Sequence, residues 1–199
     1  MPKQVDHEER REAIAQALWR VVDQQGWGRT TMRVVAHEAG VSLGQLQHYF
    51  ASRREMLTFA RELAAEHTSD RVERSVRDLP RPPHPRDALE AALTEMLPLH
   101  PDSRATSRLH AAFVLESLHD PQLHEQARAG LQAGRDRVEQ IIRSAMADGS
   151  IADDRDAAVE TDLLLALSGF APLLDLSVVT EGAARKAIHV HLERLFAVE

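Results

Sequence analysis

The chain has 199 residues, a formal net charge of −7 at pH 7 and no cysteine. This length is enough for one large domain or two small ones with a substantial buried core. The lack of cysteine excludes a disulfide framework and thiolate chemistry. The first nine residues are mostly polar and charged and contain no apolar segment of the kind that directs secretion, so we expect a cytoplasmic protein.

The N-terminal quarter is predicted to contain three helices. Apolar residues at helical spacing indicate a first helix over about residues 6–25. Thr31 is placed to cap a second helix, which can end at Gly40 because glycine readily takes a positive φ. Ser42 can cap a third, short helix, so that two helices meet at a tight corner. Trp27, just beyond the first helix, is interpreted as a core residue of this small domain.

The third helix is predicted to have two different faces. Leu46 and Phe50 lie four residues apart on one face, which should pack inward. The other face carries Gln45, Gln47, His48 and Tyr49. A short helix that displays amides, an imidazole and a phenol fits the DNA major groove, where glutamine can read adenine. The alternative is an ordinary helical corner with polar residues on its solvated side.

Residues 10–58 resemble the DNA-binding domain of the tetracycline-repressor (TetR) family of bacterial transcription regulators. The resemblance rests on the spacing of the stretches GWGRTTM (26–32), VAHEAGVSLGQLQHYF (35–50) and SRREML (52–57). Many family members carry Thr-Leu-Tyr at positions 45–47, where this chain has Gln-Leu-Gln, and lysine in place of Arg53. The family's tyrosine-to-phosphate contact therefore lacks a counterpart at Gln47, whereas Arg53 keeps a cation for a phosphate contact.

The resemblance implies which residues touch DNA. The expected DNA-binding residues are Arg29, Thr31, Arg33, Ser42, Gln45, Gln47, His48, Tyr49 and Arg53. Those of the third helix are expected at base edges or adjoining phosphates, and Thr31, Arg33 and Arg53 on the DNA backbone. We also expect Arg54 to belong to the basic patch.

Four further helices are predicted beyond the corner, over about residues 52–78, 86–97, 101–118 and 121–148. Ser52 and Glu55 form a capping box at the start of the first of them. The proline-rich segment 79–85 cannot be the interior of a helix and is expected to be a stiff connector. We expect a DNA-binding domain at 1–51 and a second domain, for ligand binding and dimerisation, at 52–199.

The C-terminal part contains a helix that is apolar on every side between residues 163 and 174. This run is shorter than the roughly twenty apolar residues that span a bilayer, so it should be covered by protein on both sides. Pro172 should kink or end it. The last helix, capped by Thr180, is expected to pair with it and with their counterparts from a second copy. The expected dimer-interface residues are Leu164, Leu167, Phe170, Leu173, Ile188, Leu192 and Leu195.

The resemblance supports this dimer, because TetR-family members dimerise through their last helices. The second half of the chain also resembles the C-terminal domain of the BetI-type subgroup. A ligand pocket in this half should be mainly aliphatic, because no Trp or Tyr follows Tyr49. We therefore expect an apolar effector, uncharged or anionic, and no aromatic cage for a quaternary ammonium group. Its expected contacts are Leu63, Leu93, Met96, Leu109, His110, Phe113, Glu116, Val138, Ile141 and Leu165. His110 and Glu116 are the polar candidates, with paired core groups as the alternative.

The charges are unevenly distributed along the chain. Residues 1–60 hold eight Lys or Arg against seven Asp or Glu, and residues 61–199 hold sixteen against twenty-four. The acidic part should therefore face away from DNA. The sequence contains neither a nucleophile elbow nor a phosphate-binding loop, and we expect no catalytic residue, cofactor or metal.

The sequence therefore predicts an all-α protein with a three-helix helix-turn-helix domain and a six-helix domain. Its expected function is that of a ligand-responsive, homodimeric transcriptional repressor that binds a palindromic operator and does not bind a membrane. Two alternatives remain: a ligand-blind DNA-binding dimer, and a small all-α enzyme built on Glu-x-x-His pairs.

Overall fold

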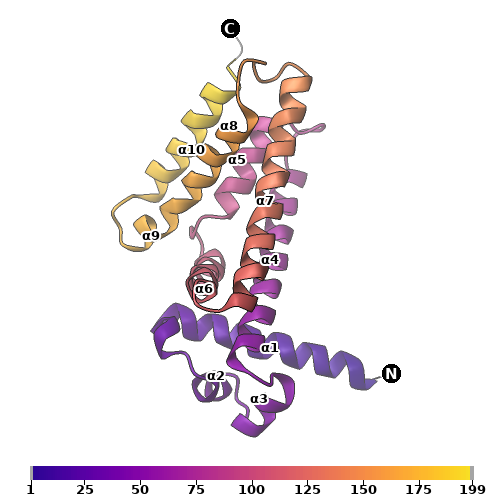
Figure 1. The fold of residues 1–199 in the computed structure, drawn as a ribbon, viewed down its shortest axis with the longest axis vertical. Coiled ribbons are helices and arrows are strands. Elements are labelled where there is room, and N and C mark those ends of the chain that lie inside the picture. Colours follow the sequence, from indigo (N-terminus) through magenta and orange to yellow (C-terminus); the bar gives the residue numbers. More distant parts are fainter. Residues whose placement is uncertain (1, 198–199) are drawn as a thin grey trace. The chain divides into compact units, whose positions relative to one another are not determined.

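A computed structural model describes residues 2–197. Side chains are described in this range except at residues 2–6 and 168. The regular elements of the described residues are all helices (Figure 1). The N-terminal elements are α1 (Pro2–Gln25), η1 (Trp27–Arg29), α2 (Met32–Glu38), α3 (Leu43–Tyr49) and α4 (Arg53–Arg77). They are followed by α5 (Pro85–Glu95), α6 (Pro101–Ser117), α7 (Pro121–Ala147), α8 (Ala157–Ala166), η2 (Leu167–Gly169), α9 (Phe170–Asp175) and α10 (Glu181–Leu195). The all-α prediction is confirmed.

The chain forms two compact units that differ from the expected division at residue 51. Unit 1 contains the chain up to residue 68 together with residues 104–125, and unit 2 contains residues 69–103 and those from 126 onward. The first part of α4 and most of α6 thus pack with α1 to α3. The division at residue 51 into a DNA-binding and a ligand-binding domain stays a prediction. It describes function, whereas the two compact units describe how the chain packs.

Unit 1 is built around the inner faces of α1, α3, α4 and α6. Its largest fully buried side chains are Ile14, Leu18, Leu46, Phe50, Met56, Leu57, Leu109, Phe113 and Leu123. The buried indole of this core is Trp19, whose Nε1 donates to the carbonyl oxygen of Ala60 at 3.0 Å. Trp27, in contrast, is only partly buried. The interpretation of Trp27 as a core residue is therefore wrong in detail, because part of this side chain stays exposed to solvent.

Unit 2 has its own apolar core, in which α10 is a central element. The core includes Leu89, Leu93, Ile142, Leu164, Ile188, Leu192 and Leu195. Four of the residues expected at a dimer interface, namely Leu164, Ile188, Leu192 and Leu195, are thus buried inside a single protomer. The reason is that helical periodicity identifies an apolar stripe without telling whether the same chain or a second copy covers it.

The helix expected around residues 163–174 is interrupted. Asp156 caps α8 by accepting from the backbone N–H groups of Ala158 and Val159, and the helix gives way to η2 before α9 begins. The break therefore lies ahead of Pro172, whose missing N–H cannot bond to the carbonyl group one turn earlier.

The segment Ala157–Asp175 is long and apolar enough to cross a membrane by length and composition alone. The run 163–174, too short by itself to span a bilayer, is thus part of a longer apolar segment. One such helix is weak evidence for a membrane protein, because a core helix of a soluble protein meets the same criteria. Here much of the apolar surface lies uncovered on one protomer: Val159, Leu163 and Leu173 are exposed.

Candidate nucleic-acid interface

The corner between α2 and α3 has the predicted caps. The Thr31 hydroxyl accepts from the backbone N–H of Val34 at 3.2 Å. A capping box begins α3: Ser42 Oγ accepts from the N–H of Gln45 at 3.1 Å, and Gln45 Oε1 accepts from the N–H of Ser42 at 2.9 Å. Gly40 has φ of 67°, the left-handed conformation that ends α2. Local hydrogen bonds therefore fix the direction of α3 relative to α2.

Two glycines of this corner provide a matched test of that geometry. Gly40→Ala is expected to destabilise the protein by about 1 kcal/mol, because an L side chain is strained at positive φ. Gly44→Ala is expected to leave the stability equal or higher by up to about 1 kcal/mol, because a Cβ there meets only Ser42 Oγ, at 4.0 Å, inside a helix. Urea unfolding followed by circular dichroism measures both. Equal effects would show that the corner does not depend on the left-handed residue.

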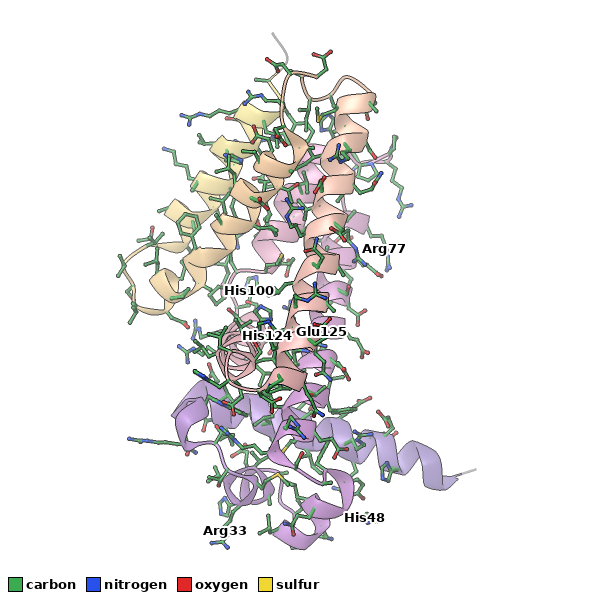
Figure 2. The ribbon with its side chains drawn as sticks, viewed as in Figure 1. Arg33, His48, Arg77, His100, His124 and Glu125 are labelled. Atoms are coloured by element: carbon green, nitrogen blue, oxygen red, sulfur yellow. The ribbon has the colours of Figure 1, made fainter. Side chains whose placement is uncertain are left out.

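The two faces of α3 differ as predicted. Leu46 is fully buried, whereas Gln45, Gln47 and His48 are exposed. Figure 2 shows Arg33 of α2 and His48 of α3 at the same outer end of unit 1. The corner thus presents amides, an imidazole and a guanidinium on one solvent-facing surface.

Tyr49 is half-buried because the N-terminal part of α1 reaches it. The rings of His7 and Tyr49 lie 4.9 Å apart between centroids, and those of His48 and Tyr49 lie 5.5 Å apart. His7 was missed in the sequence because it lies far from α3 along the chain, and no periodicity reports that contact. The ring cluster restricts the Tyr49 phenol beside the exposed face of α3.

The basic patch is smaller than expected. Arg29 and Arg33 are exposed, and neither makes an ion pair with any other described residue. Arg54, in contrast, pairs with Asp120 at 3.0 Å. Hydrogen bonding to Arg54 lowers the pKa of the Asp120 carboxyl group and so favours its charged form.

Arg53, expected to contact DNA, is turned into unit 1. Its Nε donates to the Thr30 carbonyl oxygen at 3.1 Å and its Nη2 donates to the Trp27 carbonyl oxygen at 3.2 Å. The guanidinium also lies over the Trp27 ring, 3.7 Å from its centroid. Two of the five guanidinium N–H donors are thus used by backbone carbonyl oxygens, and the contact of Arg53 with a DNA phosphate stays a prediction.

Glu116 belongs to the same cluster. Its Oε2 accepts from Trp27 Nε1 at 2.8 Å, and its Oε1 lies 3.5 Å from Arg53 Nη1. Glu116 and His119 have the Glu-x-x-His spacing on which the enzyme alternative depends. The Glu116 carboxylate, however, is occupied by Trp27 and Arg53. Glu116 is thus a paired group of unit 1, which was the alternative to a role in a ligand cavity.

The residues expected to bind an effector are divided between the units. Unit 1 contains Leu63, Leu109, His110, Phe113 and Glu116, and unit 2 contains Leu93, Met96, Val138, Ile141 and Leu165. Leu63, Leu93, Leu109 and Phe113 are buried, whereas Met96 is exposed. His110 keeps an exposed edge, yet surrounding protein atoms and the Arg61 charge lower the pKa of its imidazole.

Comparison with known proteins identifies both parts of the chain. Residues 14–58 match the model of the bacterial regulatory proteins of the tetR family, and residues 85–197 match that of the C-terminal part of BetI-type transcriptional repressors. The chain belongs to the TetR family. The resemblance found in the sequence is thereby confirmed, including its BetI-type second half.

Individual relatives and solved structures agree with this assignment. The HTH-type transcriptional regulator PksA of Bacillus subtilis is 32% identical over 98% of this chain and 94% of its own length. A transcriptional regulator from Rhodococcus has a crystal structure with a TM-score of 0.80 and 26% identity, over 95% of this chain and 99% of that one. A regulator from Saccharomonospora viridis, solved in complex with choline, has a TM-score of 0.78 and 20% identity over 94% and 95%.

The TetR-family assignment settles the class of function. The protein is a transcriptional regulator and not an enzyme. Regulators of this family bind DNA and small-molecule effectors.

Proposed function

We propose that this TetR-family protein is a cytoplasmic, homodimeric repressor that binds a near-palindromic operator through α2 and α3 and is released by a small effector. The observation that carries the proposal is the capped recognition helix, which presents Gln45, Gln47 and His48 to solvent beside Arg33. A helix of this kind reads bases from the major groove when flanking groups hold it on the phosphates.

The two glutamines differ in what they offer to a base. Gln45 Oε1 already accepts the N–H of Ser42, so its Nε2 is the group free to donate to a base acceptor such as N7 or O6 of guanine or O4 of thymine. Gln47 is exposed, and its amide can both donate and accept, which is the pattern that reads adenine. We therefore assign the adenine-type contact to Gln47 and a donor contact to Gln45.

Phosphate contacts are assigned to Arg29 and Arg33, with the capped helix N-termini that follow Thr31 and Ser42. Both arginines are exposed, and helix N-termini attract anions through their free N–H groups. Because few cations are available, we expect a modest dependence of affinity on salt concentration. Tyr49, restricted by His7, completes this surface as a contact to a base or an adjoining phosphate.

The dimer is proposed to form through the faces of α8 and α10 that the protomer core leaves uncovered. On α8 these are Val159, Leu163 and Ala166, spaced four and three residues apart, whereas Phe170, also expected at the interface, is half-buried against the core of unit 2. On α10, Ala183, Ala187 and Val190 have the same spacing and are at least partly exposed. Two such stripes from each protomer can build a four-helix interface. Leu167 and Leu173, expected there from the sequence, are half-buried and exposed respectively and remain candidates.

The effector is proposed to be mainly apolar and to lack a quaternary ammonium group. The structural relative from Saccharomonospora viridis binds choline, but cages for such cations need several aromatic rings. Beyond Tyr49 this chain has no Trp or Tyr, and Phe113, Phe170 and Phe196 are its only phenylalanines after α4. Within unit 2, the contacts expected for an apolar effector are Leu93, Met96, Val138, Ile141 and Leu165.

A thermal-shift screen paired with operator-release assays tests the effector. We expect apolar or anionic compounds that raise the melting temperature to weaken operator binding, because an effector acts only if it prefers the conformation that does not bind DNA. Choline serves as the comparison compound and should have no effect. If stabilising compounds leave operator affinity unchanged, the ligand-blind DNA-binding dimer is the better description.

A further inference from the structure

We propose that Glu116 of α6 is a positioning residue for DNA binding: it holds Trp27 and Arg53 and thereby fixes the segment that carries Arg29 and the Thr31 cap. The inference rests on the proposed DNA binding by α2 and α3. It concerns unit 1 alone, since all these residues lie within it.

The Glu116 carboxylate contacts side chains from two other elements of unit 1. One oxygen accepts from the indole Nε1 of Trp27 in η1, and the other pairs with the guanidinium of Arg53 at the start of α4. The guanidinium carbon of Arg53 in turn lies over the Trp27 ring. Three side chains from η1, α4 and α6 therefore form a closed triangle in which each one contacts the other two.

The triangle acts on the backbone that precedes α2. Arg53 donates to the carbonyl oxygen of Trp27, the first residue of η1, and to that of Thr30, which directly follows η1. Thr30 is buried and its hydroxyl donates to the Gly26 carbonyl oxygen at 2.9 Å, so the segment 26–30 has few ways to move without breaking these bonds. Arg29 lies within this segment and Thr31 follows it directly. Their positions therefore depend on Arg53, and that of Arg53 depends on Glu116.

The charge of Glu116 matters because Arg53 has no other carboxylate partner among the described residues. The Trp27 indole N–H donates to the same carboxylate, and a hydrogen bond to a charged acceptor is stronger than one to a neutral acceptor. Both side chains are more than a third exposed, Arg53 at 36% and Glu116 at 40%, so the ion pair contributes little to overall stability. Its effect should instead appear in the geometry of the DNA-binding surface.

The neighbouring pair of Arg54 and Asp120 supplies a matched control. Asp120 follows α6 by three residues and pairs with the arginine next to Arg53, but Arg54 bonds to no carbonyl group of the η1 segment. Asp120→Asn keeps a side-chain oxygen that can cap α7 and changes the net charge by the same amount as Glu116→Gln. Any general electrostatic effect on DNA binding is therefore common to the two variants.

The test compares parent, Glu116→Gln and Asp120→Asn in operator binding over a range of salt concentrations. We expect Glu116→Gln to weaken operator binding on the order of tenfold with an unchanged salt slope, because a positioning residue releases no counterions. Asp120→Asn should bind as the parent does or slightly more tightly. Arg33→Ala should lower the salt slope by about one, as a direct phosphate contact does.

A second readout does not depend on DNA. The indole N–H resonance of Trp27, identified by its loss in Trp27→Phe, should shift in Glu116→Gln and stay in place in Asp120→Asn. Tighter DNA binding by Glu116→Gln with a steeper salt slope would overturn the inference, because Glu116 would then be masking Arg53 from phosphate. Unchanged operator affinity in Glu116→Gln would also overturn it. A parent protein that binds no DNA sequence would reject the proposed function itself, and this role with it.

Discussion

Leu192→Glu is expected to unfold unit 2, whereas a glutamate at position 163 should leave it folded. Leu192 is fully buried in the core of the unit, so the new carboxylate would lack both solvent and a partner. Even the milder change Leu192→Ala should lower the free energy of unfolding by about 2–5 kcal/mol through the cavity that it leaves. Thermal unfolding followed by circular dichroism measures both effects.

Leu163→Glu is the matched variant that separates the dimer from the core. Leu163 is 48% exposed in the protomer and its neighbour Leu164 is 0% exposed, although both belong to α8. We expect Leu163→Glu to yield a folded monomer by sedimentation analysis and Leu164→Glu to yield unfolded protein. A Leu163→Glu protein that remains a dimer would place the interface elsewhere, and a parent protein that is monomeric at high concentration would remove it altogether.

Gln45→Glu is expected to abolish specific operator binding while the helix that carries it stays intact. Glutamate at this position can still accept the N–H of Ser42, so the capping box is preserved. The donor of the amide is lost and a negative charge faces the phosphates, which together should weaken binding by about 2–4 kcal/mol, or on the order of a hundredfold. Fluorescence anisotropy with labelled operator gives the affinity, and a melting temperature equal to that of the parent shows that α3 is intact.

Gln45→Ala completes that experiment because it loses the contact and the cap at once. Its operator affinity should fall less than that of Gln45→Glu, whereas its stability should fall more. Preference among operator variants should relax at one base pair of each half-site. If Gln45→Glu binds operator as tightly as the parent, α3 does not approach DNA through this residue.

The sequence carried most of the information about the corner between α2 and α3, because that geometry is local. Ser42 and Gln45 are three residues apart, and the hydrogen bonds they form require only a helix start between them. Gly40 has the positive φ that its residue type predicted. Local spacing of this kind can be read without knowing anything about the rest of the chain.

Contacts between distant segments could not be predicted in the same way. The sequence indicated that Arg53 offers a cation to a DNA phosphate. In the structure its Nε and Nη2 donate to carbonyl oxygens more than twenty residues earlier in the chain. Leu192 of α10 and Leu163 of α8 are both leucines on predicted helices. Leu192 is fully buried, whereas Leu163 is exposed. Helical periodicity gives the direction of a side chain around its own axis and leaves open what lies opposite it.

Selection of binding sites from random duplex DNA, at a stated salt concentration, tests whether two copies of α3 read one operator. We predict enrichment of one near-palindromic sequence whose half-sites are separated by about one helical turn, or a multiple of it, between their centres. We also predict that the Gln45→Glu protein enriches no such sequence. Failure of the parent protein to enrich any sequence, or enrichment of a single unpaired half-site, would contradict a dimer that reads DNA through two copies of α3.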